Sequence, residues 1–373
     1  MFTTYDRHLL GRLLHTFGVF FVAAYGLYIV IDLFTNVDDF QEGASTTGGL
    51  ALLIAEYYLY RASEFFEMAG PILIVLAVIT VLALLQKNSE AYPILAAGIP
   101  ARRLLRPLLV ATVILNGILV VNQEFVIPSI AVALQTPRGS ATARVQKVEP
   151  VYDYSNQLMH IDGEQVLVQT QEIVNASFTL PRCDLSTQTY ALTAENAVFV
   201  SATPTTPSGW LLRNLKSPLD PTILTEEGRK RVIPRDNGKD VFIVSAVSFD
   251  QLYNGGRNLK LLSSAQLVER IRNPSTGMVP VRSQTLALHS RVTRPLLCVL
   301  NIVIALPLVM RRETRSLITN MAVCALVLGV FYGVAQACAA LGTLGMLRPD
   351  LAAWLPVILT GFTCTLTSGF VQT

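Results

Sequence analysis

The chain has 373 residues, of which 51% are hydrophobic and only 15% are charged, and its mean hydropathy is +0.47. This composition argues against an ordinary soluble domain and favours a polytopic membrane protein, in which lipid solvates the apolar excess. The formal net charge of +3 is small for this length, so nucleic-acid binding has no electrostatic support.

The first predicted span covers Leu13–Phe34. Arg7 and Arg12 precede it, whereas Asp38 and Asp39 follow it, and this asymmetry predicts a cytoplasmic amino terminus. A signal peptide is the competing interpretation. The apolar run is longer than a signal h-region of roughly 7 to 15 residues, and no clean small-residue cleavage site follows it. We therefore expect a retained helix.

The segment Leu50–Glu67 is mainly apolar but carries several charged residues, which predicts an interfacial helix. It leads into a second span at about Met68–Gln86. Pro71 is expected in the first turns of that span, where a missing backbone donor does little damage. A third span is predicted from Leu104 or Pro107 to Ile127.

Three further spans are predicted at Leu286–Met310, Leu317–Leu344 and Ala352–Val371. Each is long enough for the roughly 20 residues that cross about 30 Å of hydrocarbon. The fourth span ends at a basic loop that contains Arg311 and Arg312. With six spans, both termini and both basic loops fall on the cytoplasmic side of the membrane.

The region between Pro128 and about Ser263 has a different texture, with polar and apolar residues alternating at a period of two. The predicted strands lie within Leu158–Gln171, Tyr190–Ser201, Gly209–Leu215 and Asp240–Phe249. Asp162-Gly163 is expected to form a tight hairpin turn, and Ala202–Ser208 a loop. Short strands over about 130 residues predict a sandwich, a jelly roll or an open barrel.

The fold class that follows is a six-helix membrane protein with an inserted, jelly-roll-like β domain. The predicted domains are residues 1–128, with three spans, residues 129–262, with the β domain, and residues 263–373, with three spans. A helix at Ser263–Ile271, capped by Ser263 or Ser264, is expected to return the chain to the membrane.

The segment 88–107 joins two spans on their basic side. It predicts a short helix at 88–100 with a lone acid, Glu90, near its start, followed by Arg102, Arg103 and Arg106 at the headgroups. A small, alanine-rich helix with one acidic residue suits insertion into a groove on a cytoplasmic motor. An ordinary basic loop is the simpler alternative.

Motifs of catalysis are absent from the sequence. It holds no Walker-type phosphate loop, HExxH, paired CxxC or GxSxG, and its four histidines are dispersed. We therefore expect no catalytic residues, no cofactor and no metal site, and any ATP hydrolysis must come from another chain. Four of the five cysteines lie in apolar segments and are expected to pack as small hydrophobes, and Cys183 stands alone in the polar region, so no disulfide is expected there.

Ionisable residues within the spans are scarce. Asp32 and Glu124 lie near the outer ends of their spans and could reach the interface. His15 and Asn116 also lie within spans, where interhelical hydrogen bonding is the simpler interpretation than transport chemistry. This pattern disfavours an ion-coupled transporter and an intramembrane enzyme.

Taken in order, these segments resemble the lipopolysaccharide-export permease family of the LptF/LptG type, also called YjgP/YjgQ. The resemblance is carried by motifs along nearly the whole chain: Asn88–Gly98, Arg102–Pro107, Asn122–Pro128, Ala194–Ala197 with Trp210–Asn214, Leu288–Arg291 with Pro295 and Ala305–Leu308, and Ala353–Pro356.

The resemblance implies a transmembrane subunit of an ABC-type lipid exporter. It implies three protein partners: a dimeric cytoplasmic ATPase, a second six-span permease subunit in a heterodimer or homodimer, and a periplasmic jelly-roll bridge. The cargo would be a lipopolysaccharide-like lipid, and the first and fifth spans would form lateral gates. The coupling residues implied are Ser89, Glu90, Ile94, Leu95, Gly98, Arg102 and Arg103.

Two features depart from the family pattern. Pro93 lies inside the expected coupling helix, so either the helix starts at Pro93 or Glu90 occupies a strained first turn. After the first span, where one paralogue carries lysines, this chain has Asp38, Asp39 and Glu42, which would repel lipid phosphates. The partner subunit would then supply the cations, or the cargo is a different lipid.

A second hypothesis is a membrane-anchored periplasmic scaffold that binds a partner at a sheet edge and has no transport role. Loss of Glu90 would cripple export under the first hypothesis and leave partner capture intact under the second.

Overall fold

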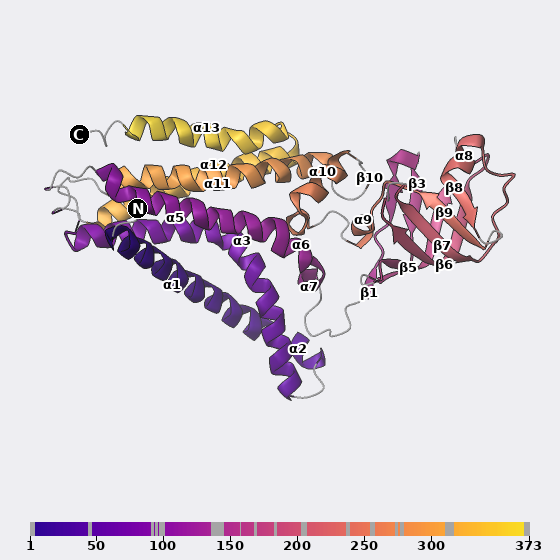
Figure 1. The fold of residues 1–373 in the computed structure, drawn as a ribbon, viewed down its shortest axis with the longest axis horizontal. Helices are drawn as coiled ribbons and strands as arrows, with labels where there is room; N and C mark the ends of the chain where they lie inside the picture. The colour runs from indigo at the N-terminus through magenta and orange to yellow at the C-terminus, as the bar shows by residue number, and fades with distance from the viewer. Residues whose placement is uncertain are drawn as a thin grey trace. The chain divides into compact units, whose positions relative to one another are not determined.

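The computed structural model describes residues 4–43, 47–90, 93, 96, 101–135, 145–156, 158–167, 170–182, 185–202, 207–235, 239–253, 258–272, 275–276, 280–309 and 317–368. The chain divides into two compact units (Figure 1). One comprises Met1–Leu134 with Thr285–Thr373, and the other comprises Gln135–Gln284.

Within the part of the chain that the structure describes, six helices are long and apolar enough to cross a membrane. They are α1 (Thr4–Thr35), α3 (Thr47–Lys87), α5 (Ala101–Val121), α11 (Val281–Val309), α12 (Leu317–Leu344) and α13 (Pro349–Ser368). Short elements follow α1 and α5: α2 (Val37–Gly43), the π-helix η1 (Asn122–Val126), α6 (Ile127–Ser129) and α7 (Ala131–Gln135). The predicted fold class, six spans with an inserted antiparallel β region, is confirmed.

The second predicted span is corrected by the structure. The charged lead-in and the span form one continuous 41-residue helix, α3, and Pro71 lies in its interior rather than in its first turns. In Figure 1 the ribbon of α3 changes direction part-way along its length. An interior proline removes a backbone hydrogen bond and crowds the preceding turn, which is the usual cause of such a bend.

Buried apolar side chains of α1, α3, α5, α11 and α12 form the core of the helical unit. Leu9 and Leu13 of α1 have no exposed surface, and they anchor the amino-terminal end of that helix. Cys298, Cys324, Cys338 and Cys364 are buried free thiols, as predicted. Buried Asn116 donates to the Thr112 carbonyl at 2.9 Å and to Cys298 Sγ at 3.4 Å, so its expected interhelical role is confirmed.

The second unit is built on one antiparallel sheet in the order β10-β2-β3-β5-β6-β7-β9-β8, with β4 paired to β5 and β1 to β4. Its strands are β1 (Val145–Lys147), β2 (Val151–Asp153), β3 (Met159–Asp162), β4 (Gln165–Leu167), β5 (Glu172–Leu180), β6 (Tyr190–Val200), β7 (Gly209–Leu215), β8 (Val232–Arg235), β9 (Asp240–Val244) and β10 (Ser275–Thr276). Its short helices are η2 (Tyr154–Asn156), α8 (Glu226–Arg231), α9 (Phe249–Tyr253), η4 (Leu259–Leu261) and α10 (Ser264–Arg272).

The predicted strands at Tyr190–Ser201 and Gly209–Leu215 are confirmed as β6 and β7. The predicted strand Asp240–Phe249 is shorter, because β9 ends at Val244. Most of the predicted loop at 202–208 lies outside the described residues.

The predicted hairpin at Asp162-Gly163 is wrong. β3 and β4 do not pair with each other; both pair with β5 in one register, with Asp162 opposite Ser177 and Gln165 opposite Val174. They are two parts of one interrupted strand. A Cβ on Gly163 would lie 2.3 Å from Ile173 Cγ2, so the glycine permits close packing within the sheet rather than a chain reversal.

Trp210 of β7 is fully buried at the centre of the β unit. Its ring lies 5.2 Å from that of Phe199 and 6.1 Å from that of Phe178, measured between centroids. The indole Nε1 donates to the Val247 carbonyl at 3.1 Å. The aromatic body therefore fills the core while its one polar group is satisfied.

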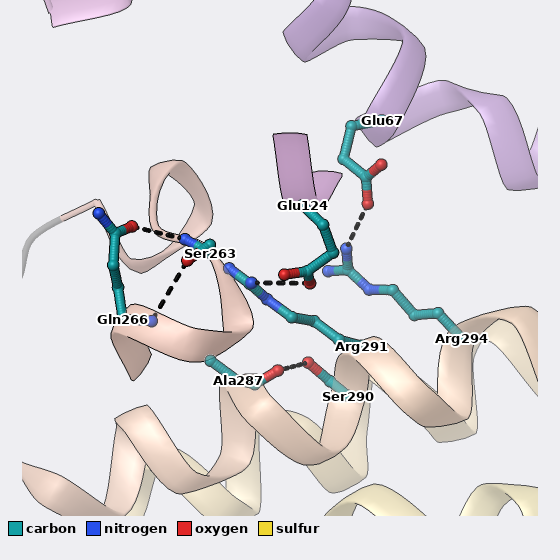
Figure 2. Close-up of polar contacts among 8 residues, drawn as sticks. All are labelled: Glu67, Glu124, Ser263, Gln266, Ala287, Ser290, Arg291 and Arg294. Carbon is teal, nitrogen blue, oxygen red and sulfur yellow. Dashed lines mark hydrogen bonds and ion pairs between the residues drawn. The ribbon is translucent and has the colours of Figure 1, made fainter. Parts of the chain in front are cut away.

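Helix α10 begins with a capping box, which is drawn in Figure 2. The Gln266 amide donates to Ser263 Oγ at 3.2 Å, and the Ser263 amide donates to Gln266 Oε1 at 2.8 Å. The cap predicted at Ser263 or Ser264 is thus Ser263, because its partner three residues on completes the reciprocal pair.

Candidate functional site

The turn that ends α3 carries Ser89 and Glu90. The Ser89 amide donates to the Gln86 carbonyl and the Glu90 amide to the Leu85 carbonyl, each at 3.1 Å, and Ser89 has a φ of 56°. These are the features of a Schellman motif, in which a left-handed residue closes a helix and satisfies its last carbonyls. Serine rather than glycine occupies the left-handed position here, at some steric cost.

Glu90 is held by Arg12 of α1 in a bidentate ion pair. Arg12 Nη1 donates to Glu90 Oε2 at 2.8 Å, and Nη2 donates to Oε1 at 2.9 Å. Asn88 Nδ2 adds a hydrogen bond to Oε1 at 3.2 Å. The two side chains of the ion pair keep 30% and 29% of their surface exposed, so the pair can be reached from outside the chain.

The electrostatics of this turn favour the ionised carboxylate. The hydrogen bonds from Arg12 lower the pKa of Glu90, with smaller contributions from Asn88 and from the charges of Arg12 and His8, although partial burial opposes the shift. Glu90 therefore presents a fixed negative charge at the end of α3.

The structure describes only part of the predicted coupling segment. Glu90 lies in the turn after α3 and not in the first turn of a helix, while Pro93 and Ala96 have helical backbone and exposed side chains. Arg102 and Arg103 lie in the first turn of α5, and Arg103 is exposed. Ile94, Leu95 and Gly98 lie outside the described residues.

A second polar site, which the sequence analysis missed, lies among the helices (Figure 2). Arg291 Nη1 of α11 lies 3.3 Å from Glu124 Oε1 of η1, and Arg294 Nη1 of α11 lies 3.6 Å from Glu67 Oε1 of α3. We call these four residues the charged joint. The signal was present in the sequence, since two arginines three residues apart in an apolar span mark a functional site by default.

The π-helix η1 is tied to α3 next to the charged joint. Ser63 Oγ donates to Asn122 Oδ1 at 2.7 Å, and Asn122 Nδ2 donates to the Ser63 carbonyl at 3.1 Å. A π-helix is rare and often marks a functional site. Here it continues α5 at the stretch that the sequence analysis took as the exit of the third span.

Comparison with known families decides the class of protein. A family model described as the lipopolysaccharide export system permease LptF/LptG matches residues 7–368. The chain belongs to this family. A search of curated proteins gave no match. The resemblance read from the sequence is therefore confirmed over nearly the whole chain, and a permease is a transport subunit.

In this LptF/LptG permease the acidic segment after the first span forms α2. Asp38 and Asp39 are exposed on it, whereas Phe40 is fully buried against Tyr57 and Tyr58. Asp32, at the end of α1, accepts a hydrogen bond from Tyr58 Oη at 2.9 Å, so it joins two helices rather than only reaching the interface. Among the described residues, no group of three His, Cys, Asp or Glu side chains is placed to hold a metal ion.

Proposed function

We propose that this permease is the membrane-spanning subunit of an ABC-type exporter, which draws a lipopolysaccharide-like amphiphile out of the inner membrane. A separate dimeric ATPase drives it, and a periplasmic bridge receives the lipid. The basic ends of the helices face the cytoplasm, as do both termini, and the β unit is periplasmic. The placement of basic residues supports this orientation.

The observation that carries the proposal is the bidentate pair of Arg12 and Glu90. It links the segment that would contact the ATPase directly to the first turns of α1, which family resemblance assigns to a lateral gate. Because the carboxylate is partly exposed, a cation of the ATPase can also bind it. Movement of the segment 88–100 would then reach α1 through a short, strong contact.

The second permease subunit has a candidate contact surface on α12. Gly329 and Gly333 are spaced as in a GxxxG motif, and a Cβ at either position would meet nothing within 4 Å in the described structure. Small residues at this spacing let helices approach closely in lipid. By contrast, Gly342 of the same helix packs within the chain, where its Cβ would lie 2.7 Å from that of Ala352. The open glycines support pairing with a second subunit.

The test is Glu90→Gln in the complete complex of permease subunits and ATPase, reconstituted in proteoliposomes. We expect release of lipopolysaccharide per ATP hydrolysed to fall at least about tenfold, because the charge that the ATPase grips is gone. Glu64→Gln is the matched control, since Glu64 lies on α3, the helix that ends in the turn holding Glu90, and forms an ion pair with Arg61 at 2.6 Å. Export at the wild-type rate by the Glu90→Gln complex would refute the proposed coupling role.

A further inference from the structure

The two ion pairs of the charged joint have different surroundings. The Arg291 and Glu124 side chains keep only 11% and 23% of their surface exposed, and their contact at 3.3 Å is a hydrogen bond as well as an ion pair. Arg294 is 50% exposed, while its partner Glu67 is 16% exposed. The first pair holds η1 to α11, and the second leaves half of the Arg294 side chain exposed in the single chain. Both pairs are drawn in Figure 2.

The Arg294–Glu67 pair is also the looser of the two. Its separation of 3.6 Å exceeds hydrogen-bond distance, and within the described residues the buried Oε2 of Glu67 has no hydrogen-bond partner. A guanidinium has five N–H donors, and the planar fork suits an oxyanion. Arg294 therefore has donors available for a ligand, and its present counter-ion holds it weakly.

The charges of the joint lie at similar distances from the basic ends of their helices. Glu67 precedes Lys87 by about 20 residues, Glu124 follows Arg106 by about 18, and Arg294 precedes the end of α11 at Val309 by about 15. At about 1.5 Å per residue these separations are roughly 22 to 30 Å. The hydrocarbon core is about 30 Å thick, so helices whose basic ends face the cytoplasm place the charged joint near the outer headgroups.

We propose that Arg294 binds the phosphate of a lipid headgroup in the outer leaflet. This contact replaces the ion pair of Arg294 with Glu67, while the Arg291–Glu124 pair keeps the helices in place. This inference rests on the proposed function and its orientation. It also supplies a cation from this chain, despite the acids of α2. Glu67 and Glu124 stay close to the phosphate and repel it, so binding is reversible, as a transport site requires.

The experiment measures binding of bisphosphorylated lipid A and of its dephosphorylated form to the complete nucleotide-free complex in phosphatidylcholine nanodiscs. Arg294→Gln should weaken binding of the bisphosphorylated lipid at least about tenfold and leave the dephosphorylated lipid unchanged, since only the phosphate contact is lost. Glu67→Gln should strengthen binding of the bisphosphorylated lipid by about threefold, because the competing carboxylate is removed. A folding defect cannot produce that gain.

Arg348→Gln is the matched control, because Arg348 is an exposed arginine that lies 3.4 Å from Asp350 in the turn between α12 and α13. It should change neither affinity. Inorganic phosphate in excess should not displace the lipid, since a headgroup site draws much of its affinity from the acyl chains; displacement would assign the site to a soluble anion and overturn the proposal.

Two other outcomes are decisive. If both variants shift affinity in the same direction, or act equally on the two lipids, Arg294 is a structural residue and the inference fails while the proposed function stands. If the wild-type complex binds neither lipid, the proposed function fails and the inference fails with it.

Discussion

The contact between Arg12 and Glu90 allows a quantitative test by a double-mutant cycle. The variants are Arg12→Gln, Glu90→Gln and the double substitution, which remove the two charges singly and together. If the bidentate pair stabilises the helical unit, each single substitution lowers the free energy of unfolding, and the double substitution lowers it by less than the sum of the two single losses. The difference between that sum and the loss in the double variant is the interaction energy of the pair.

The expected magnitude follows from geometry and exposure. Exposed ion pairs contribute about 0.2–1 kcal/mol, and hydrogen bonds to charged groups about 1.5–3 kcal/mol. With two hydrogen bonds of 2.8 and 2.9 Å but about 30% of each side chain exposed, solvent screens much of the gain. We expect an interaction energy of about 1 kcal/mol, roughly a fivefold change in the unfolding equilibrium constant.

The assay is chemical unfolding of the full chain in mixed detergent micelles, followed by helical circular dichroism, at pH 7 and low salt. The interaction energy should shrink as salt is raised. An interaction energy within about 0.3 kcal/mol of zero under these conditions would refute the reasoning.

The pH dependence has a definite sign. Because the folded-state pKa of Glu90 is lowered, the unfolded chain binds its proton at higher pH than the folded chain does. The stabilisation is therefore complete above the ordinary glutamate pKa of about 4.3 and is lost as the pH falls through the lower folded-state value. Glu90→Gln should abolish this part of the pH profile.

Three further predictions concern local packing. Ser89→Val should lower the unfolding free energy by about 1–2 kcal/mol, because a β-branched residue disfavours the left-handed conformation. Ser89→Gly should not lower it, and equal losses in the two variants would exclude the Schellman motif. Trp210→Ala should destabilise the β unit by about 3–5 kcal/mol, read from chemical unfolding of the full chain, and an unchanged unfolding midpoint would contradict its central place. Gly342→Val should lower the unfolding free energy of the chain by about 1–3 kcal/mol. Gly333→Val should leave that free energy unchanged and weaken co-purification with a second permease subunit. The reverse pattern would exclude the proposed contact surface.

Hydropathy and period-two patterning located most of the elements. The six spans and the strands β6 and β7 were predicted because each depends on signals within a window of 7 to 30 residues. The hairpin at Asp162-Gly163 failed for the opposite reason. An Asp-Gly pair favours a turn locally, but β3 and β4 share one register on β5, and that pairing decides the path of the chain.

The candidate site shows the same division. The sequence marked Glu90 as the lone acid of a basic loop, and family resemblance gave it a role, but nothing in the sequence pointed to Arg12 as its partner. The two residues are 78 positions apart, and they meet because α1 packs against the end of α3.

The sequence by itself determined the class of protein, the number of spans and the family, because lipid imposes long apolar helices whose pattern is local and readable. Only the tertiary structure decided which charges meet. Arg291 and Glu124 are 167 positions apart, and their contact depends on how α11 packs beside η1. A charge within an apolar span needs a counter-ion close by, and the packing of the helices determines which opposite charge lies within reach.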